Sequence, residues 1–155
     1  MILEGIDMTK RCYFAYGSNM SVAEMQWRCP GALLLETARL DAHRFVINAR
    51  GVATVTPDPA GAVYGVLWQI TVDHEEALDL YEGVRLGFYK KRTKGVMNLE
   101  GRQTKALIYT ATDSTPGRPR DGYLEEILSA AKGHGFPSSY IKELEKWLRA
   151  GAPHS

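Results

Sequence analysis

Short hydrophobic runs alternate with turn residues along the first two thirds of the chain. The runs predict strands at residues 12–16, 33–40, 44–49, 52–56, 62–70, 88–97 and 104–110. Turn residues separate these segments at Asp41-Ala42, Arg50-Gly51 and Asn98-Leu-Glu-Gly101, and most densely at Pro57-Asp-Pro-Ala-Gly61. Several strands joined by such short breaks predict an antiparallel sheet.

Two segments near these strands have the residue spacing of a helix start. Each places Ser or Asp three positions before Glu, as in a capping box: Ser21 with Glu24, and Asp73 with Glu76. Pro30-Gly31 is placed to end the first helix and Gly83 the second. The residues expected to share one face of the second helix are Ala77, Leu78 and Tyr81.

Helical periodicity returns after a loop at residues 114–122, over residues 123–132 and 138–149. The expected inward-facing positions are Leu124, Ile127, Leu128 and Ala131 in the first helix, and Ile141, Leu144, Trp147 and Leu148 in the second. Many strands with helices at a few places predict an α+β fold whose sheet is closed or strongly curved.

Composition and charge fit one compact domain with a small partner. The 155 residues are 45% hydrophobic, and the net charge of +1 favours neither a nucleic-acid nor a membrane partner. The sequence shows no apolar segment of membrane-spanning length and no signal peptide, so we expect a cytoplasmic protein. Cys12 and Cys29 are expected to be free thiols, with a disulfide between them as the alternative. The histidines lack metal-ligand spacing, so no metal site is expected.

The stretch YFAYGSNM, residues 13–20, places small polar residues directly after a predicted buried strand. Gly17 can turn the chain, and the backbone N–H groups of Ser18, Asn19 and Met20 would then converge at a helix start. Such a turn can bind a carboxylate or phosphate. The alternative is that Ser18 or Asn19 merely caps a helix.

Glu82 is expected at the C-terminus of the second helix, at the border of its apolar face. The helix dipole is negative there, so an exposed carboxylate would cost about 0.3–1 kcal/mol. The unfavourable field and partial burial should both raise its pKa toward the range of a general base. The alternative is an exposed glutamate at a frayed helix end.

Together these two stretches resemble the γ-glutamylcyclotransferase family, within the AIG2-like superfamily. The family pattern of Tyr-Gly-Ser-Asn, and of Glu-Gly followed by Gly-x-Tyr, matches Tyr16 to Asn19 and Glu82 to Tyr89. Further similar segments are Arg28-Cys-Pro-Gly-Ala32, Ala38-Arg-Leu40, residues 51–57 and 63–68, Tyr123, Ala131-Lys132, Gly135, Pro137 and Tyr140. The resemblance implies a single domain at residues 11–149, with tails at 1–10 and 150–155.

The resemblance also implies a fold and a reaction. The fold is a small mixed closed β-barrel flanked by helices, in agreement with the strand-rich pattern. In the reaction, the α-amine of a γ-glutamyl group attacks its own γ-carbonyl, which releases 5-oxoproline and an amino acid or amine. No cofactor is implied. The form of the Tyr-Gly-Ser-Asn motif is closer to the branch that acts on γ-glutamyl amino acids than to the glutathione-specific or γ-glutamylamine branches. The loops at residues 86–88 and 114–120 are expected to line the pocket of the leaving group.

Site residues are carried over from the family one by one. Glu82 matches the catalytic glutamate, which would move the proton from the α-ammonium to the leaving nitrogen. The turn of Tyr16, Gly17, Ser18, Asn19 and Met20 would bind either the α-carboxylate or the developing oxyanion. Tyr123 is implied to orient the substrate through its hydroxyl, with core packing as the alternative.

Three other interpretations remain open at this level. The same pocket could belong to a binding module without turnover, or the chemistry could act on a γ-glutamylated biosynthetic amine. A serine nucleophile is a further alternative, although no base lies near Ser18 in the sequence. The basic cluster Lys90, Lys91, Arg92 and Lys94 is expected to be a solvated strand face.

Overall fold

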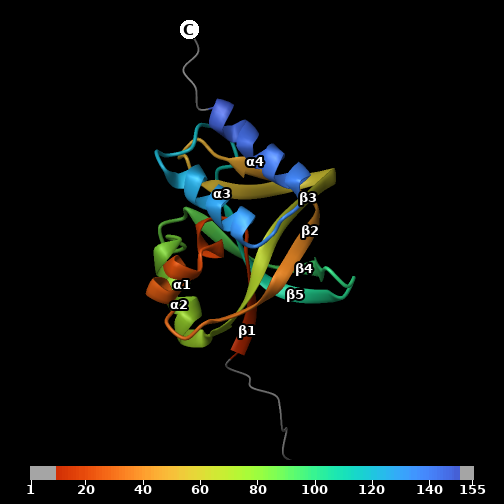
Figure 1. Ribbon diagram of the computed structural model, residues 1–155. Coiled ribbons are helices and arrows are strands. Elements are labelled where there is room, and N and C mark those ends of the chain that lie inside the picture. The colour runs from red at the N-terminus through yellow and green to blue at the C-terminus, as the bar shows by residue number, and fades with distance from the viewer. Residues whose placement is uncertain (1–9, 151–155) are drawn as a thin grey trace, which may run out of the picture.

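The computed structural model describes residues 10–150 of the chain (Figure 1). Residue 10 begins the first strand and residue 150 ends the last helix, so the predicted tails lie almost wholly outside the described residues. Within residues 10–150, no helix has both the length and the apolar character needed to cross a bilayer.

Five strands close into a barrel in the order β1-β3-β2-β4-β5. Their bounds are β1 Lys10–Ala15, β2 Leu33–Ile47, β3 Ala53–Thr71, β4 Tyr89–Asn98 and β5 Gln103–Ala111. β1 pairs in parallel with β5, where Tyr13 lies opposite Leu107, and the other four pairings are antiparallel. The predicted α+β fold with a small mixed closed β-barrel is therefore confirmed.

The two longest strands each join segments that the sequence pattern separates. The predicted breaks at Asp41-Ala42 and at residues 57–61 are wrong, since β2 and β3 run through them. Asp41 pairs with Ala62 and His43 with Pro57, so the turn-rich residues between Pro57 and Ala62 form a bulge opposite Ala42. These residues bend a paired strand instead of ending it. The predicted turn at Arg50-Gly51 does separate β2 from β3.

Helix α1, Val22–Arg28, starts as predicted, because the Ser21 hydroxyl accepts a hydrogen bond from the Glu24 N–H at 3.3 Å. Helix α2, Val72–Tyr81, does not start at the predicted pair Asp73 and Glu76. Its capping box uses Thr71 as N-cap and the His74 side chain in place of the usual Glu or Gln. Gly83 ends α2 as predicted, with a φ of 67°.

Helices α3, Tyr123–Gly133, and α4, Ser138–Ala150, pack against each other on one side of the molecule (Figure 1). All four predicted inward positions of α3 are buried. In α4, Ile141 and Leu144 are buried and Trp147 is partly buried, but Leu148 is 40% exposed. Leu148 lies near the end of the chain's last helix, where the contact with the core stops.

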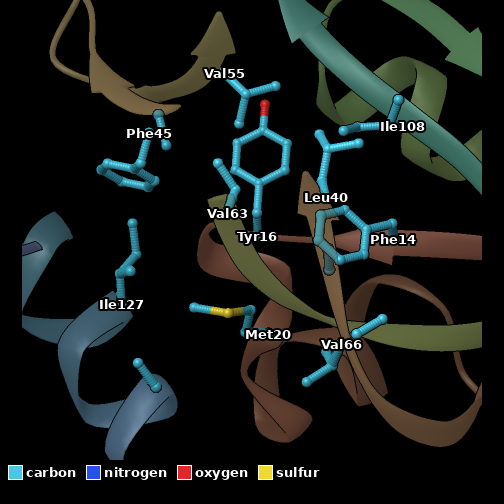
Figure 2. Packing of buried hydrophobic residues seen from close by; sticks show 14 of the residues in the cluster. Phe14, Tyr16, Met20, Leu40, Phe45, Val55, Val63, Val66, Ile108 and Ile127 are labelled. Atoms are coloured by element: carbon cyan, nitrogen blue, oxygen red, sulfur yellow. The ribbon is translucent and has the colours of Figure 1, made fainter. Parts of the chain in front are cut away.

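The hydrophobic core fills the barrel and continues to the inner face of α3. Figure 2 shows part of this cluster, with Phe14 from β1, Leu40 from β2, Val66 from β3 and Ile127 from α3. Each large side chain of this kind stabilises the fold by about 1.5–3 kcal/mol when fully buried. Tyr16 belongs to the same cluster, so the core directly supports the turn that follows β1.

Candidate active site

A cavity of about 240 Å³ lies where the turn after β1, the end of α2 and the start of α3 meet. Six of the seven residues predicted to form a site line it: Tyr16, Gly17, Ser18, Asn19, Glu82 and Tyr123. These residues come from three segments far apart in the sequence. The fold therefore brings the two predicted halves of the site together.

Met20 is the predicted residue that does not line this cavity. Its side chain is fully buried in the core, and its N–H donates to the Gly17 carbonyl at 3.1 Å. The Met20 carbonyl lies 2.7 Å from His134 Nε2. Met20 thus holds the turn in place, and its N–H is not available to a ligand.

The turn after β1 forms a 3₁₀ helix over Ser18–Met20. Ser21 caps the following α1, so the alternative that Ser18 or Asn19 serves as its cap is wrong. Within residues 10–150, no acceptor pairs with the N–H groups of Ser18 and Asn19, as expected for the first residues of a helical turn. A side chain at Gly17 would start 3.5 Å from the Tyr123 hydroxyl, so glycine keeps the cavity open there.

Asn19 is 2% exposed and is held on three sides. Its amide nitrogen donates to Tyr13 Oη at 3.0 Å, and its backbone carbonyl accepts from Trp68 Nε1 at 2.9 Å. Its side-chain oxygen accepts from Arg28 Nη1. A buried polar side chain with this many partners has a fixed orientation.

Arg28, at the end of α1, supports the turn from behind. Its Nη1 donates to Ser18 Oγ at 3.2 Å as well as to Asn19, and its Nη2 lies 2.9 Å from Glu24 Oε2. The guanidinium also lies over the Tyr81 ring, 3.6 Å from the centroid. Arg28 therefore places a fixed positive charge beside the turn, which favours an anion in the cavity.

Glu82 directly follows α2, and its N–H donates to the Leu78 carbonyl at 2.8 Å. The residue is half-buried, so the alternative of an exposed glutamate at a frayed end is wrong. Burial raises the pKa of its carboxyl to about 7, although the charge of Arg28 acts in the opposite direction. A pKa near neutrality suits a group that accepts and returns a proton.

Four tyrosines surround this carboxyl. Burial, and to a smaller extent the charge of Glu82, raises the pKa of each of them: Tyr13, Tyr16, Tyr89 and Tyr123. All four hydroxyls therefore stay protonated and can act as neutral hydrogen-bond donors.

The tyrosine hydroxyls also fix the surrounding backbone. Tyr16 Oη donates to the Tyr109 carbonyl and Tyr89 Oη to the Ala53 carbonyl, both at 2.6 Å. Tyr123 Oη instead accepts from the Ala53 N–H at 3.0 Å. Its own proton has no acceptor within residues 10–150 and is available to a ligand.

Sequence reasoning missed several residues of this cavity. Arg50, Tyr89 and Tyr109 line it, although none of them was assigned a role. Phe88 and Arg120 also line it, and they come from the two loops expected to border the pocket of the leaving group.

The predicted solvated strand face is confirmed for Lys90, Lys91 and Arg92, which are exposed. The ion pair of Lys91 with Glu75, and its 3.1 Å approach to Asp79 Oδ2, were not predicted. Asp79 in turn accepts a 2.6 Å hydrogen bond from Tyr109 Oη, so this ion pair supports the cavity wall.

Fold and cavity together define an AIG2-like protein, and a model of the AIG2-like family matches residues 62–144. The chain is 30% identical to the gamma-glutamylcyclotransferase of Homo sapiens over 151 residues, which cover 91% of this chain and 80% of that protein. It is also 30% identical to the gamma-glutamylcyclotransferase of Bos taurus over 142 residues, or 85% of this chain and 76% of that one.

A solved structure of a gamma-glutamyl cyclotransferase is similar throughout. It has a TM-score of 0.82 and 29% identity, and the match covers 88% of this chain and 86% of that one. The chain therefore belongs to the gamma-glutamylcyclotransferase family.

Proposed function

We propose that this protein is a γ-glutamylcyclotransferase in which Glu82 is the general base and then the general acid. The single observation that carries the proposal is a carboxyl with a pKa of about 7 in the same cavity as the turn at residues 16–19. Relatives at 30% identity bear the name of this activity.

A single carboxyl group, that of Glu82, can carry out the proton transfers of the reaction. Glu82, when ionised, takes a proton from the substrate's α-ammonium, and the free amine attacks the γ-carbonyl carbon. In the tetrahedral intermediate the attacking nitrogen still carries one excess proton. Collapse of the intermediate breaks the bond to the leaving nitrogen, which receives the first proton from Glu82. Glu82, ionised again, then takes the excess proton from the ring nitrogen and passes it to the released amine. The products are 5-oxoproline and the amine in its ammonium form, and Glu82 is ionised as at the start. Because the nucleophile is tethered to the carbonyl, correct positioning supplies much of the rate.

The turn at residues 16–19 is proposed to bind an anionic oxygen of the substrate. The N–H groups of Ser18 and Asn19 and the charge of Arg28 suit both the α-carboxylate and the oxyanion of the intermediate. Kinetics distinguish the two: loss of a carboxylate contact raises KM, whereas loss of an oxyanion contact lowers kcat. Tyr123 is proposed to donate its free hydroxyl proton to the same substrate.

The second candidate is a module that binds a small acid without turnover. Glu82 argues against it, because a buried carboxylate weakens anion binding and gives a simple binding site no advantage. We also propose a cytoplasmic location, since Cys12 and Cys29 are both free thiols.

The test is 5-oxoproline release from a panel of γ-glutamyl dipeptides and γ-glutamylamines. Wild type should release it, and Glu82→Gln should reduce kcat about a hundred- to ten-thousandfold while the protein stays folded. Glu76→Gln, an exposed glutamate on the same helix, is the matched control and should retain full activity. A wild type that is inactive on the whole panel would refute the assignment.

A further inference from the structure

Two arginines lie at the rim of the cavity, where side chains are exposed, whereas the inner wall is largely buried. Arg50 comes from the turn between β2 and β3, and Arg120 from the loop before α3, and both are exposed and line the cavity. Within residues 10–150, neither forms an ion pair with a carboxylate. Asp113 is the acidic residue on which the charge of Arg50 acts, but its carboxylate accepts the Thr115 N–H instead.

Both arginines are held in position. The Arg50 guanidinium lies 3.6 Å from the centroid of the Phe88 ring, which leaves its N–H edges free. Arg120 Nε donates to the Arg50 carbonyl at 2.9 Å, and the Arg120 N–H donates to the Gly51 carbonyl at 3.1 Å. The loop and the turn therefore form one unit that carries two guanidinium groups.

The turn itself has little freedom. Asn48 Oδ1 accepts from the N–H of Arg50 at 3.0 Å and of Val52 at 3.3 Å. Gly51 has a φ of 85°, and a Cβ there would lie 2.7 Å from Arg120 Cγ. Only glycine fits this close approach, so the sequence Arg50-Gly51 fixes where the first arginine points.

The charges of the cavity can be matched to those of a substrate. On the proposed function, Glu82 faces the α-ammonium, and the turn backed by Arg28 takes an anionic oxygen of the glutamyl part. Arg50 and Arg120 are then left for the other end of the substrate, the leaving amine. A guanidinium binds a carboxylate through two parallel hydrogen bonds, so two guanidinium groups suit a ligand with more than one carboxylate.

We propose that Arg50 and Arg120 form a specificity subsite for a leaving group that carries negative charge. This inference rests on the proposed function of the same cavity. It gives an order of preference: a leaving acidic amino acid first, a neutral amino acid second, and an amine without a carboxylate last. The two arginines determine which γ-glutamyl compounds react and take no part in the proton transfer.

The experiment compares kcat/KM for γ-glutamyl-glutamate, γ-glutamyl-alanine and γ-glutamyl-alanine amide. Wild type should prefer them in that order. Arg50→Gln and Arg120→Gln should each reduce kcat/KM for γ-glutamyl-glutamate by about tenfold, with a smaller loss for γ-glutamyl-alanine and the smallest for the amide. The control is Arg118→Gln, an exposed arginine in the same loop that does not line the cavity, and it should keep the wild-type order.

Equal losses on all three substrates, or a wild type without the predicted order, would overturn the subsite. If wild type releases no 5-oxoproline from any of them or from the wider panel, the proposed function fails, and calorimetry then tests the subsite separately. In that case γ-glutamyl-glutamate should bind to wild type and to Arg118→Gln about tenfold more tightly than to the Arg50→Gln, Arg120→Gln double variant. Equal affinities would overturn the subsite in this case too.

Discussion

The inner wall of the cavity differs from its rim in how its side chains are held. At the inner wall, Asn19 is 2% exposed and has hydrogen-bond partners on three sides. At the rim, Arg50 and Arg120 are exposed, and neither forms an ion pair with a carboxylate within residues 10–150. The inner wall includes β1 and the turn that follows it, the end of α2 and the start of α3. The rim is built from two connecting segments. Such a division lets the rim change without disturbing the groups that move the proton.

The two regions also differ in how their charge acts. Burial raises the pKa of Glu82 to about 7, so its charge depends on pH near neutrality. The rim instead offers arginine side chains, a residue type whose positive charge does not change near neutral pH. Changes at the inner wall should therefore alter pH profiles, and changes at the rim should alter substrate preference and salt dependence.

The largest effect on kcat should come from shortening the side chain of Glu82, in the inner wall, by one methylene. Glu82→Asp keeps the charge but withdraws it from the substrate, so we expect kcat to fall by about a hundredfold or more. The rim should be unaffected, and the order of substrate preference should persist in the residual activity. A variant with nearly wild-type kcat would show that the exact position of this carboxyl does not matter.

The second effect concerns stability. Because the folded-state pKa of Glu82, about 7, lies above the ordinary value of 4.5, the folded protein binds this proton more tightly than the unfolded chain does. Glu82 therefore stabilises the fold below pH 4.5, and this contribution is lost as the pH rises through 7. Glu82→Gln should be more stable than wild type at pH 8, by about 1–3 kcal/mol, and similar to it at pH 4.5.

Denaturant unfolding at both pH values measures this difference. Glu76→Gln again serves as the control, since its side chain is exposed. If Glu82→Gln changed the free energy of unfolding equally at pH 4.5 and pH 8, the carboxyl would not have a raised pKa in the folded protein.

The third effect is a shift of the pH profile. Arg28 lowers the pKa of Glu82, so Arg28→Ala should move the acidic limb of kcat/KM to higher pH and reduce kcat/KM at pH 7 by about tenfold. Glu24→Gln removes the ion-pair partner of Arg28 but leaves its bonds to Ser18 and Asn19, and should change little. If the acidic limb of kcat/KM stayed at the same pH in Arg28→Ala, Arg28 would have no influence on the group that transfers the proton.

The smallest effect should be seen with salt. The rim arginines are exposed, so salt screens their attraction for a charged leaving group. Raising the ionic strength should reduce kcat/KM for γ-glutamyl-glutamate by about twofold to fivefold and that for γ-glutamyl-alanine amide by less. If kcat/KM depended equally on salt for both substrates, the negative charge of the leaving group would not be bound by the rim arginines.

Features set by neighbouring residues could be predicted from the sequence. The buried stripe of α3 follows from helical periodicity, and Gly83 ends α2 at the predicted point. The hydrophobic pattern gave wrong strand ends where pairing between distant segments determines how far a strand runs. Residues 57–61 read as a turn, but they form a bulge because β2 pairs on both sides of them.

The same distinction applies to the cavity. Glu82 and the turn at residues 16–19 were assigned to one site through the resemblance to the family, because local features alone left a helix cap and an exposed glutamate as alternatives. The structure places both in one cavity. Met20 was misplaced because its N–H donates to the Gly17 carbonyl within the turn, a bond that the sequence pattern does not reveal. The loop that carries Arg120 was expected to line the pocket of the leaving group. Arg50 and its contact with Arg120 could not be predicted, since the two meet only when the turn after β2 and the loop before α3 bond to each other.

The proposal that Glu82 carries the proton in the cyclisation can be tested directly by the pH dependence of kcat/KM for wild type and Glu82→Gln. We expect a limb near pH 7 in wild type, where Glu82 ionises, and no such limb in the residual activity of Glu82→Gln. A variant that kept the wild-type limb would contradict it, because another group would then be the base.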